Sequence, residues 1–408
     1  MDLPIRRLSG KAASARLSRV PVPFQVKGEP WTPPPSRSLS GTSPPGVFIG
    51  RYGYPKVNVG PLLPPFHGDT TLLDLPEAWL DFDFPEIVAF RSSLVRGMRR
   101  MPVAVGTEGG RLLEQVQELA IASRPADVEL AFSRSPRGGV SSDRVSQPFG
   151  PSAPLLQMGT SSVKTDARLE RAWGDGDLRA GSAIVRLYRE GVEVSRIMRA
   201  LSAGVLGLQD GRKLVPTRWS ITAVDDTVGR RLLEDVRAYP LIDDFRVYES
   251  VRLDNRFLVL LFPRVWSYEL LEAWFPRTTW NPSVREIAMI GDSEGYRGRK
   301  AYASIRGCYY AARFAVAEAL ARERRQATAV VLRETHPGHL LPLGVWNVRE
   351  NVRRALRHPY VSFPDLTQAL SYVGTRFEIP LEEWVRQSAV ISFALRQRRL
   401  TDFTGWAG

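Results

Sequence analysis

The sequence predicts an α+β fold in which a central, mainly antiparallel sheet is surrounded by helices, with an irregular N-terminal segment and a flexible C-terminal tail. Three observations support this fold class. Apolar, β-rich stretches cluster in the middle of the 408 residues, and amphipathic helical patterns lie around them. The first 45 residues are instead rich in proline, serine and arginine. Strands that cluster together favour α+β over a doubly wound sheet, in which strands and helices alternate.

Composition divides the chain into three segments. Residues 1–45 contain the stretch WTPPPSRSLSGTSPP and are expected to be extended, with little helix or sheet of their own. Residues 46–395 are expected to form the α+β core, with room for a subdivision near residues 160–180. Residues 396–408 form the polar tail RQRRLTDFTGWAG. Because chain ends are usually loose unless contacts hold them, this tail is expected to be flexible.

Within the core, the spacing of apolar residues predicts the elements in order. Helices are expected over 85–100, 111–123, 164–173 and 181–203, and strands in MPVAV and DVELAFS. Further strands are expected in VPTRWSITAVDD, FRVYESVRLDN and RFLVLLFPRVWSY, with a tight turn at Asp254-Asn255. The amphipathic stretch GCYYAARFAVAEALARERR predicts a helix near 307–325. It is followed by the strand ATAVVLRET and by helices near 347–357 and 380–396.

The charge of the chain indicates a polyanionic partner. The formal net charge is +13 and the isoelectric point is near 10.1, and arginine supplies most of the 56 cationic residues. The planar guanidinium group pairs with phosphate through two hydrogen bonds and stacks on bases. Nucleic acid is therefore the first hypothesis for the partner. The alternative is that arginine is simply frequent in the genome that encodes the chain.

The supply of metal ligands is limited. Cys308 is the only cysteine, which excludes a disulfide within the chain and a cysteine-based zinc site. A metal would have to bind mostly to carboxylates, which favours Mg²⁺ or Mn²⁺. The segment RETHPGHLLPLGVWNVRE holds Glu334, His336, His339 and Glu350. A proline and a glycine between the two histidines break a helix there, so a structural role is favoured over a zinc site.

Two stretches combine basic and aromatic residues. VFIGRYGYPKVNVGP, residues 47–61, contains Arg51, Tyr52 and Lys56 on a backbone interrupted by glycines. RKLVPTRWSITAVDDT, residues 212–227, contains Lys213 and Arg218 before a tryptophan. Such residues suit contact with phosphates together with stacking on bases. For the first stretch, a strand-turn-strand packed by its tyrosines is an equally good interpretation.

The second stretch ends on the adjacent acids Asp225 and Asp226. Carboxylates at the end of a strand can hold a divalent cation that activates water against a phosphodiester. Adjacent residues of a strand point to opposite faces, so both acids can bind one metal only where the strand ends. The favoured alternative is that Asp226 is the N-cap of a following helix.

Four blocks of the sequence resemble one known family. FIGRYGYPKVNVGP, KLVPTRWSITAVDD, the helix with YYAARFAVAE, and PLGVWNVRE are similar to the archaeal Nre ("novel repair") family. The similarity covers the chain from about Pro44 onward. It implies a DNA repair protein that works with the replication sliding clamp, PCNA. Many relatives begin with a cysteine-rich zinc module, which this chain lacks.

The resemblance also gives a role to the C-terminal tail. Members of the family commonly end in a clamp-binding peptide that has a glutamine, an aliphatic residue three places on and a pair of aromatics a further three places on. Gln397, Leu400 and Phe403 have this spacing, whereas Thr404 stands where the second aromatic is expected. Trp406 is a candidate substitute for that aromatic.

The first functional hypothesis is a DNA-binding repair factor that its tail recruits to PCNA. The second is a metal-dependent nuclease that uses Asp225 and Asp226, with Glu108 or Glu334 as further ligands. The third is an RNA-binding or RNA-processing protein, which would explain the charge but not the tail. The start of the chain has no apolar signal core, and no apolar run approaches the length of a membrane span, so a cytoplasmic protein is expected. The resemblance to the Nre family implies that it is associated with the nucleoid of an archaeal cell.

Overall fold

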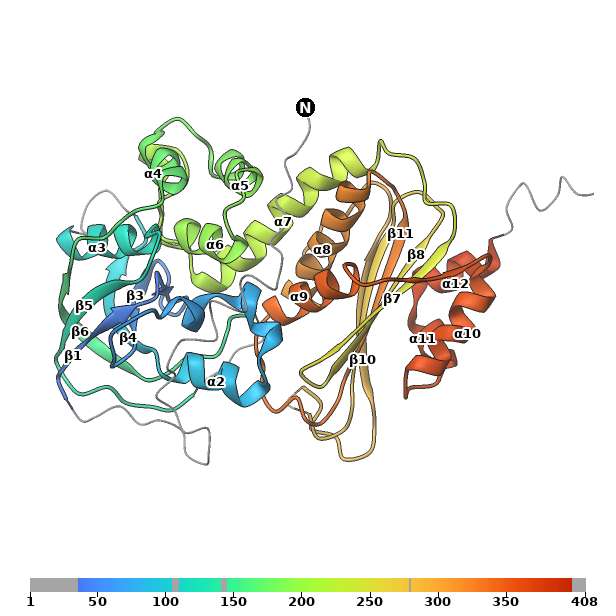
Figure 1. The fold of residues 1–408 in the computed structure, drawn as a ribbon, viewed down its shortest axis with the longest axis horizontal. Helices are drawn as coiled ribbons and strands as arrows, with labels where there is room; N and C mark the ends of the chain where they lie inside the picture. Colours follow the sequence, from blue (N-terminus) through green and yellow to red (C-terminus); the bar gives the residue numbers. More distant parts are fainter. Residues whose placement is uncertain (1–35, 105–109, 141–144, 279, 398–408) are drawn as a thin grey trace, which may run out of the picture. The chain divides into compact units, whose positions relative to one another are not determined.

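The computed structural model describes residues 36–104, 110–140, 145–278 and 280–397, and it confirms the α+β fold class (Figure 1). The strands are divided between two six-stranded sheets. The chain forms two compact units. Unit 1 comprises the described residues up to Val228 together with Pro342–Asn347, and unit 2 comprises Gly229–Leu341 and the described residues from Val348 onward.

The sheet of unit 1 has the order β1-β5-β6-β4-β3-β2, and its neighbouring strands are antiparallel except for β4 and β6. The strands are β1 (Ser38–Ser43), β2 (Val47–Ile49), β3 (Lys56–Leu63), β4 (Val95–Pro102), β5 (Ala126–Phe132) and β6 (Ser152–Thr160). β1 therefore lies within the segment that was expected to be extended. Strands β3 and β4 approach so closely that a Cβ atom on Gly60 would lie 1.9 Å from the carbonyl oxygen of Gly97, which requires glycine at position 60.

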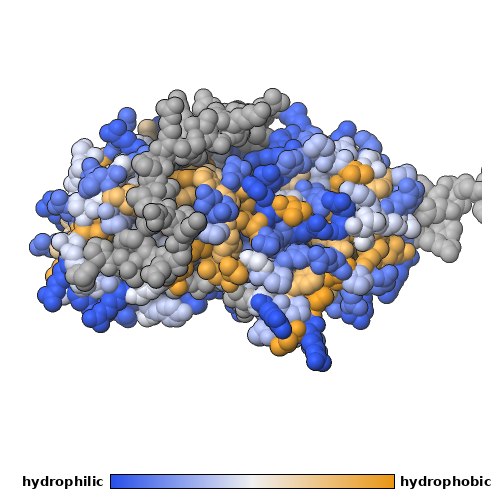
Figure 2. Space-filling model, turned by 60° about the horizontal axis from the view of Figure 1, so that its bottom comes forward, coloured by the Kyte–Doolittle hydropathy of each residue, from blue (hydrophilic) through white to orange (hydrophobic). Residues whose placement is uncertain are grey.

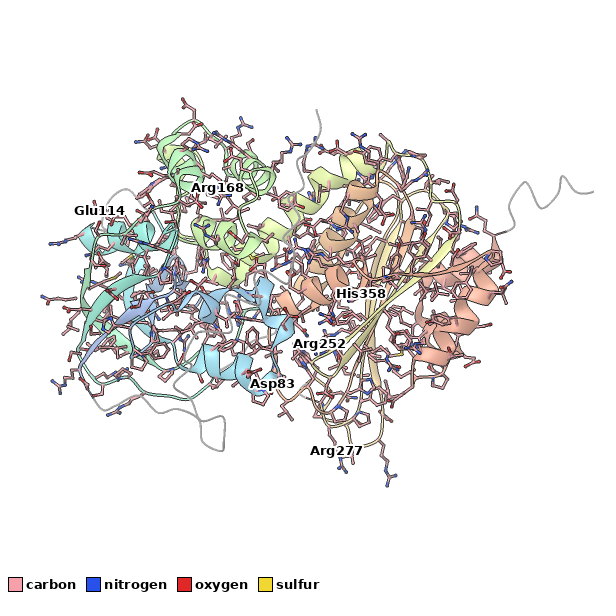
Figure 3. The ribbon with its side chains drawn as sticks, in the orientation of Figure 1. Asp83, Glu114, Arg168, Arg252, Arg277 and His358 are labelled. Atoms are coloured by element: carbon pink, nitrogen blue, oxygen red, sulfur yellow. The ribbon has the colours of Figure 1, made fainter. Side chains whose placement is uncertain are left out.

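Helices of unit 1 pack on this sheet and on one another. α3 and α6 contact the sheet, α5 packs onto α6, and α4 packs onto α5. The helical elements are η1 (Thr71–Asp74), η2 (Pro76–Asp81), α2 (Phe84–Ser92), α3 (Gly110–Ala120), α4 (Ala167–Gly174), α5 (Ala180–Arg189), α6 (Val194–Ser202) and η3 (Gln209–Gly211). Asp83, labelled in Figure 3, caps α2 by accepting a hydrogen bond from the backbone N–H of Glu86, whose carboxylate accepts one in return.

The sheet of unit 2 has the order β10-β9-β11-β8-β7-β12 and is antiparallel except between β9 and β11. Its strands are β7 (Phe245–Arg252), β8 (Asn255–Phe262), β9 (Tyr268–Trp274), β10 (Ala288–Glu294), β11 (Thr328–Thr335) and β12 (Val361–Phe363). β8 and β11 are central, and their runs of consecutive apolar residues are buried on both faces. Such runs are typical of strands that helices cover on both sides.

Two groups of helices cover the two faces of this sheet (Figure 1). One group consists of α8 (Gly307–Glu323) and α9 (Trp346–Ala355), and the other of α10 (Leu366–Arg376), α11 (Leu381–Gln387) and α12 (Ala389–Arg396). Tyr309 of α8 packs edge-on against Tyr268 of β9, with 4.9 Å between the ring centroids. On the opposite face, Trp384 of α11 is fully buried and stacks on Phe377 within the main apolar cluster of the unit. Unit 2 is therefore a three-layer helix–sheet–helix arrangement.

Several of the predicted elements were wrong. The helix predicted over 181–203 is divided into α5 and α6, and the helix predicted near 380–396 is divided into α11 and α12. The stretch VPTRWSITAVDD, predicted as a strand, forms the first half of α7 (Thr217–Val236). Its buried residues Ile221, Val224 and Val228 repeat at intervals of three and four, which is the helical period, although β-branched residues gave the stretch a strand-like composition. The helix predicted over 85–100 ends at Ser92, and its second half is the central strand β4.

Both hydrophilic and hydrophobic residues are found on the surface of the protein. On the face shown in Figure 2, hydrophilic residues are interspersed with separate groups of hydrophobic ones. In the described parts of the chain, no helix has the length and apolar character needed to cross a membrane.

Candidate nucleic-acid interface

The turn between β2 and β3 exposes the first predicted group of residues. Hydrogen bonds from Gly50 N to Asn58 O (2.7 Å) and from Lys56 N to Gly53 O (2.9 Å) close this turn. Gly53 has a φ of +80°, a conformation that glycine adopts without strain. Every residue from 51 to 56 is exposed, and the side chain of Tyr52 is 74% exposed. The segment is thus a strand-turn-strand, as the alternative interpretation had it, but its two tyrosines are largely exposed instead of buried between the strands.

The second predicted group lies beside this turn. The backbone of Val103, after β4, links the two groups, because its N–H donates to Pro55 O (2.9 Å) and its carbonyl accepts from Leu214 N (2.8 Å). At the start of α7, Thr217 Oγ1 accepts a hydrogen bond from Ile49 N (3.0 Å). The rings of Tyr54 and Trp219 are 5.3 Å apart. Two stretches that are about 160 residues apart in sequence thus meet on one surface of unit 1.

This basic–aromatic surface carries five cationic and three aromatic side chains. Its members are Arg51, Tyr52, Tyr54, Lys56, Arg100, Lys213, Arg218 and Trp219. All five residues predicted to bind DNA lie within it. Arg100 was not predicted; it pairs with Asn58 across β3 and β4, and its guanidinium group lies against Gly53.

The surface has the parts that contact with a nucleic acid needs. The guanidinium carbon of Arg51 lies 4.7 Å from the centre of the Tyr52 ring, a cation–π contact that holds both side chains outside the fold. Tyr52, Tyr54 and Trp219 are 74%, 50% and 47% exposed, so part of each ring can be reached by a partner. Cations beside exposed aromatic rings can bind phosphates while bases stack on the rings.

A second basic–aromatic segment, which sequence reasoning missed, lies in unit 2. This 295–306 loop, between β10 and α8, exposes Tyr296, Arg297, Lys300, Tyr302 and Arg306. Residues 47–61 were selected because arginine and lysine alternate with tyrosine over a short stretch. The 295–306 loop has the same combination of residues, so the same criterion would have found it.

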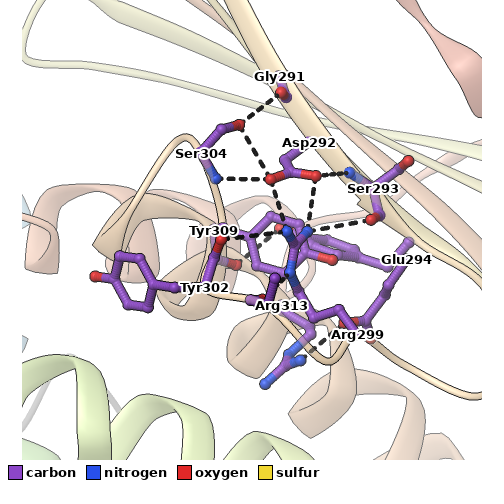
Figure 4. Close-up of polar contacts among 12 residues, drawn as sticks. Gly291, Asp292, Ser293, Glu294, Arg299, Tyr302, Ser304, Tyr309 and Arg313 are labelled. Carbon is purple, nitrogen blue, oxygen red and sulfur yellow. Dashed lines mark hydrogen bonds and ion pairs between the residues drawn. The ribbon is translucent and has the colours of Figure 1, made fainter.

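The 295–306 loop is held by a network of half-buried polar contacts around Asp292 (Figure 4). Asp292 Oδ1 lies 2.7 Å from Arg299 Nη1, and Asp292 Oδ2 accepts from Ser304 N at 2.7 Å. Burial acts to raise the pKa of Asp292, but hydrogen bonds from Arg299 and Ser304 outweigh it and lower the pKa to about 2. Arg299 also lies over the ring of Tyr309, 4.8 Å from its centre. The exposed side chains of the 295–306 loop are therefore carried by a backbone that these contacts hold in place.

The adjacent acids have a different setting from the one predicted. Asp225 and Asp226 lie in the middle of α7, so neither the end of a strand nor a helix N-cap is correct. Asp225 is fully buried.

The further predicted metal ligands do not join this pair. Glu108 lies outside the described residues, and Glu334 is buried in unit 2, where it accepts a hydrogen bond from Ile379 N at 2.9 Å. Among the residues that the structure covers, no group of three or more histidine, cysteine, aspartate and glutamate side chains is arranged to hold a metal. A metal at the acidic pair stays a prediction.

The predicted clamp-binding tail begins where α12 ends. Gln397 is the C-cap residue of α12, its side chain is exposed, and its Oε1 accepts a hydrogen bond from Arg264 Nη1 at 3.2 Å. Leu400, Phe403 and Trp406 lie outside the described residues.

The two histidines of RETHPGH belong to polar networks inside unit 2. His339 is 1% exposed, and its Nδ1 lies 3.0 Å from Leu253 O, in the turn between β7 and β8. Burial, together with the charge of Arg333, lowers the pKa of His339 to about 3. His336 is less buried, and a hydrogen bond to Glu334 raises its pKa. His339 therefore holds the hairpin turn as a neutral side chain.

Acidification is expected to destabilise the protein through His339. The unfolded chain protonates this histidine near pH 6.5, whereas the folded chain resists protonation down to about pH 3. The free energy of unfolding should therefore fall as the pH falls through this window, by up to about 1.4 kcal/mol per pH unit. Urea denaturation between about pH 7 and about pH 4 measures the slope. His339→Asn keeps a polar side chain beside Leu253 O and Asn255 but does not titrate, so the free energy of unfolding should depend less steeply on pH; equal slopes would contradict this role.

Comparison with known proteins gives one consistent family. The family described as "Archaeal Nre, N-terminal" matches residues 24–281, and that described as "Archaeal Nre, C-terminal" matches residues 294–403. DNA repair protein NreB of Archaeoglobus fulgidus is 44% identical over 368 residues, which cover 90% of this chain and 92% of the relative. DNA repair protein NreA of the same organism is 36% identical over 89% of this chain and 90% of the relative.

A more distant relative agrees with these two. DNA repair protein NreA of Haloferax volcanii is 35% identical over 86% of each chain. No solved structure matches the chain. Because the two family regions together span most of the sequence and the relatives are similar over nearly their whole lengths, the chain belongs to the archaeal Nre family.

Proposed function

We propose that this protein is a DNA repair protein that binds DNA through the basic–aromatic surface of unit 1 and is recruited to the sliding clamp, PCNA, by its C-terminal tail. The repair role rests on the relatives, which are named DNA repair proteins. The DNA-binding role rests on one observation above the others. Five cations and three aromatic side chains from distant parts of the sequence converge on one surface.

The arrangement of charge supports contact with the sugar–phosphate backbone. Lys56 begins β3 and Lys213 bridges to Ala104, so the two lysines lie on adjacent segments of unit 1. Cations on such a surface bind phosphates of any sequence and release the counterions of the DNA. Unpaired bases can stack on the exposed rings of Tyr52, Tyr54 and Trp219. Bases inside a duplex cannot, because they already stack on one another. The surface is therefore suited to DNA that contains a single-stranded part, and the 295–306 loop supplies a second candidate contact of the same chemistry.

Removing single charges tests this assignment. Lys56→Ala and Arg218→Ala should each weaken DNA binding on every sequence and reduce the slope of log K against log salt concentration by about 1, because each removes one phosphate contact. Fluorescence anisotropy over a series of salt concentrations measures both quantities. The control is Lys164→Ala, which removes an exposed lysine outside the basic–aromatic surface and should leave the slope unchanged. An unchanged slope for both surface variants would refute the assignment.

The recruitment role rests on the tail and on its position. The spacing of Gln397, Leu400 and Phe403 is that of the clamp-binding peptide that the family resemblance implies. The helix before it, α12, leaves Phe393 62% and Leu395 48% exposed. Gln397 ends this helix, so the peptide starts at the surface of unit 2.

A further inference from the structure

Unit 1 contains a small polar cavity that the proposed DNA-binding surface does not use. Its volume is about 30 Å³. Its charged lining comes from η1, α2 and α6, further polar side chains come from α7 and the segment before β6, and aromatic rings close part of the wall. The residues that matter for its chemistry are Asp74, Arg91, Ser195, Arg199, Phe48 and Phe149.

The charged lining of the cavity has an excess of positive charge. Arg91 Nη1 lies 2.5 Å from one carboxylate oxygen of Asp74, and Arg199 Nη1 lies 2.9 Å from the other. All three side chains are at least 90% buried. One aspartate therefore balances two arginines, and burial lowers the pKa of Arg91 because the cation is poorly solvated there. An uncompensated buried cation is costly, and an anion in the cavity would relieve that cost.

Two hydrogen-bonding groups of the lining have no protein partner. Arg199 Nε and Ser195 Oγ are buried and unpaired, although their residues are only 9% and 6% exposed. Buried polar atoms in folded proteins nearly always have partners, so unpaired donors at a cavity indicate a ligand. The backbone N–H of Ser195, in the first turn of α6, already donates to Glu77 Oε1 at 2.8 Å, so only the hydroxyl group of Ser195 is left for a ligand.

A third arginine lies behind the aromatic wall. The guanidinium carbon of Arg96 is 5.0 Å from the centre of the Phe48 ring and 4.8 Å from that of Phe149. Burial lowers its pKa to about 10, which still leaves it cationic at neutral pH. This third cation strengthens the attraction of the cavity for an anion.

We propose that the cavity binds one tetrahedral oxyanion, a phosphate group, held by Arg91, Arg199 and Ser195. The volume of about 30 Å³ holds about two or three water molecules, which is also room for the four oxygen atoms of a small oxyanion. The phosphate group has two sources: free inorganic phosphate, or the terminal phosphate of a DNA strand. The site does not depend on the proposed DNA-binding surface, because none of its three binding residues belongs to that surface.

Calorimetric titration of the full chain with inorganic phosphate, in a chloride buffer, tests the site. Wild type should bind phosphate and gain thermal stability from it. Arg199→Gln should abolish the binding, and Ser195→Ala, which removes only a hydroxyl group, should weaken it about tenfold. Arg171→Gln is the matched control, because it removes an exposed arginine of unit 1 and should bind as wild type does. Absence of phosphate binding in wild type, or equal binding by wild type and Ser195→Ala, would overturn the proposal.

A pair of oligonucleotides then identifies the source of the phosphate. A strand with a 5′-phosphate should bind more tightly than the same strand with a 5′-hydroxyl if the cavity takes a DNA terminus, and Arg199→Gln should remove that preference. Equal binding of the two strands, together with binding of inorganic phosphate, assigns the site to free phosphate. Failure of DNA binding altogether would refute the proposed function while leaving the phosphate titration to decide the cavity.

Discussion

Replacing Arg313 by methionine should lower the free energy of unfolding by about 3–5 kcal/mol, because it leaves a buried carboxylate without its partner. Arg313 Nη1 lies 2.9 Å from Glu294 Oε2, and the two side chains are 2% and 0% exposed. The other carboxylate oxygen accepts a hydrogen bond from Trp266 Nε1 at 3.2 Å. Figure 4 shows this pair beside the contacts that hold the 295–306 loop. Methionine keeps the unbranched apolar stem of arginine but not its guanidinium group, so the expected change also includes some lost packing against Tyr309 and Tyr310.

Two further variants separate loss of the charge pair from a general effect of the substitution. Arg313→Met with Glu294→Leu removes both charges and should recover much of the lost stability, because a buried pair replaced by apolar residues is often neutral. Arg386→Met breaks the exposed pair with Glu383, whose side chains are 67% and 40% exposed, and should cost less than about 1 kcal/mol. Urea denaturation followed by tryptophan fluorescence measures all three. A cost of Arg313→Met no larger than that of Arg386→Met would contradict the argument.

Sequence patterns predicted the parts of the fold that depend on local periodicity. The amphipathic stretch near 307–325 is α8, and the apolar runs of FRVYESVRLDN, RFLVLLFPRVWSY and ATAVVLRET contain β7, β8 and β11, whereas β9 only begins at the last residue of the second run. Where composition and spacing disagreed, composition misled: the β-branched residues of TRWSITAVDD suggested a strand, although their spacing is helical. Helix 85–100 failed because Gly97 and its neighbours are paired on both sides by β3 and β6, a tertiary effect.

The candidate sites, like the strands, could be predicted from the sequence only where they depend on local patterns. Residues near one another in sequence, such as Arg51, Tyr52 and Lys56, could be selected by their type, and so could Lys213 and Arg218. The two groups share one surface because the backbone of Val103 bonds to both segments. This pairing cannot be read from the sequence alone. The cavity lined by Asp74, Arg91 and Arg199 could not be predicted at all. Its three charged residues come from η1, α2 and α6, and none of them lies in a distinctive motif.

The tail carries the other large expected effect, the loss of clamp binding. Deleting residues 397–408 should abolish binding of the protein to PCNA. Burying two apolar side chains such as Leu400 and Phe403 contributes about 1.5–3 kcal/mol each before ordering costs. About 8 kcal/mol corresponds to a dissociation constant of about 1 μM. Their removal therefore weakens a complex of that strength by at least about 100-fold, beyond the range of a calorimetric titration.

Point variants of the full chain test whether the spaced residues, rather than the presence of a tail, carry this binding. Leu400→Ala with Phe403→Ala should match the deletion, whereas Thr401→Ala with Asp402→Ala changes the intervening positions and should bind as wild type does. Thr404→Phe restores the aromatic pair and should tighten the complex if the peptide enters an apolar pocket, because a buried phenylalanine adds about 1.5–3 kcal/mol. DNA binding should be unchanged in all of these variants, since the basic–aromatic surface lies in unit 1. Retained clamp binding by the truncated protein would move the contact away from the tail, to another surface of the chain.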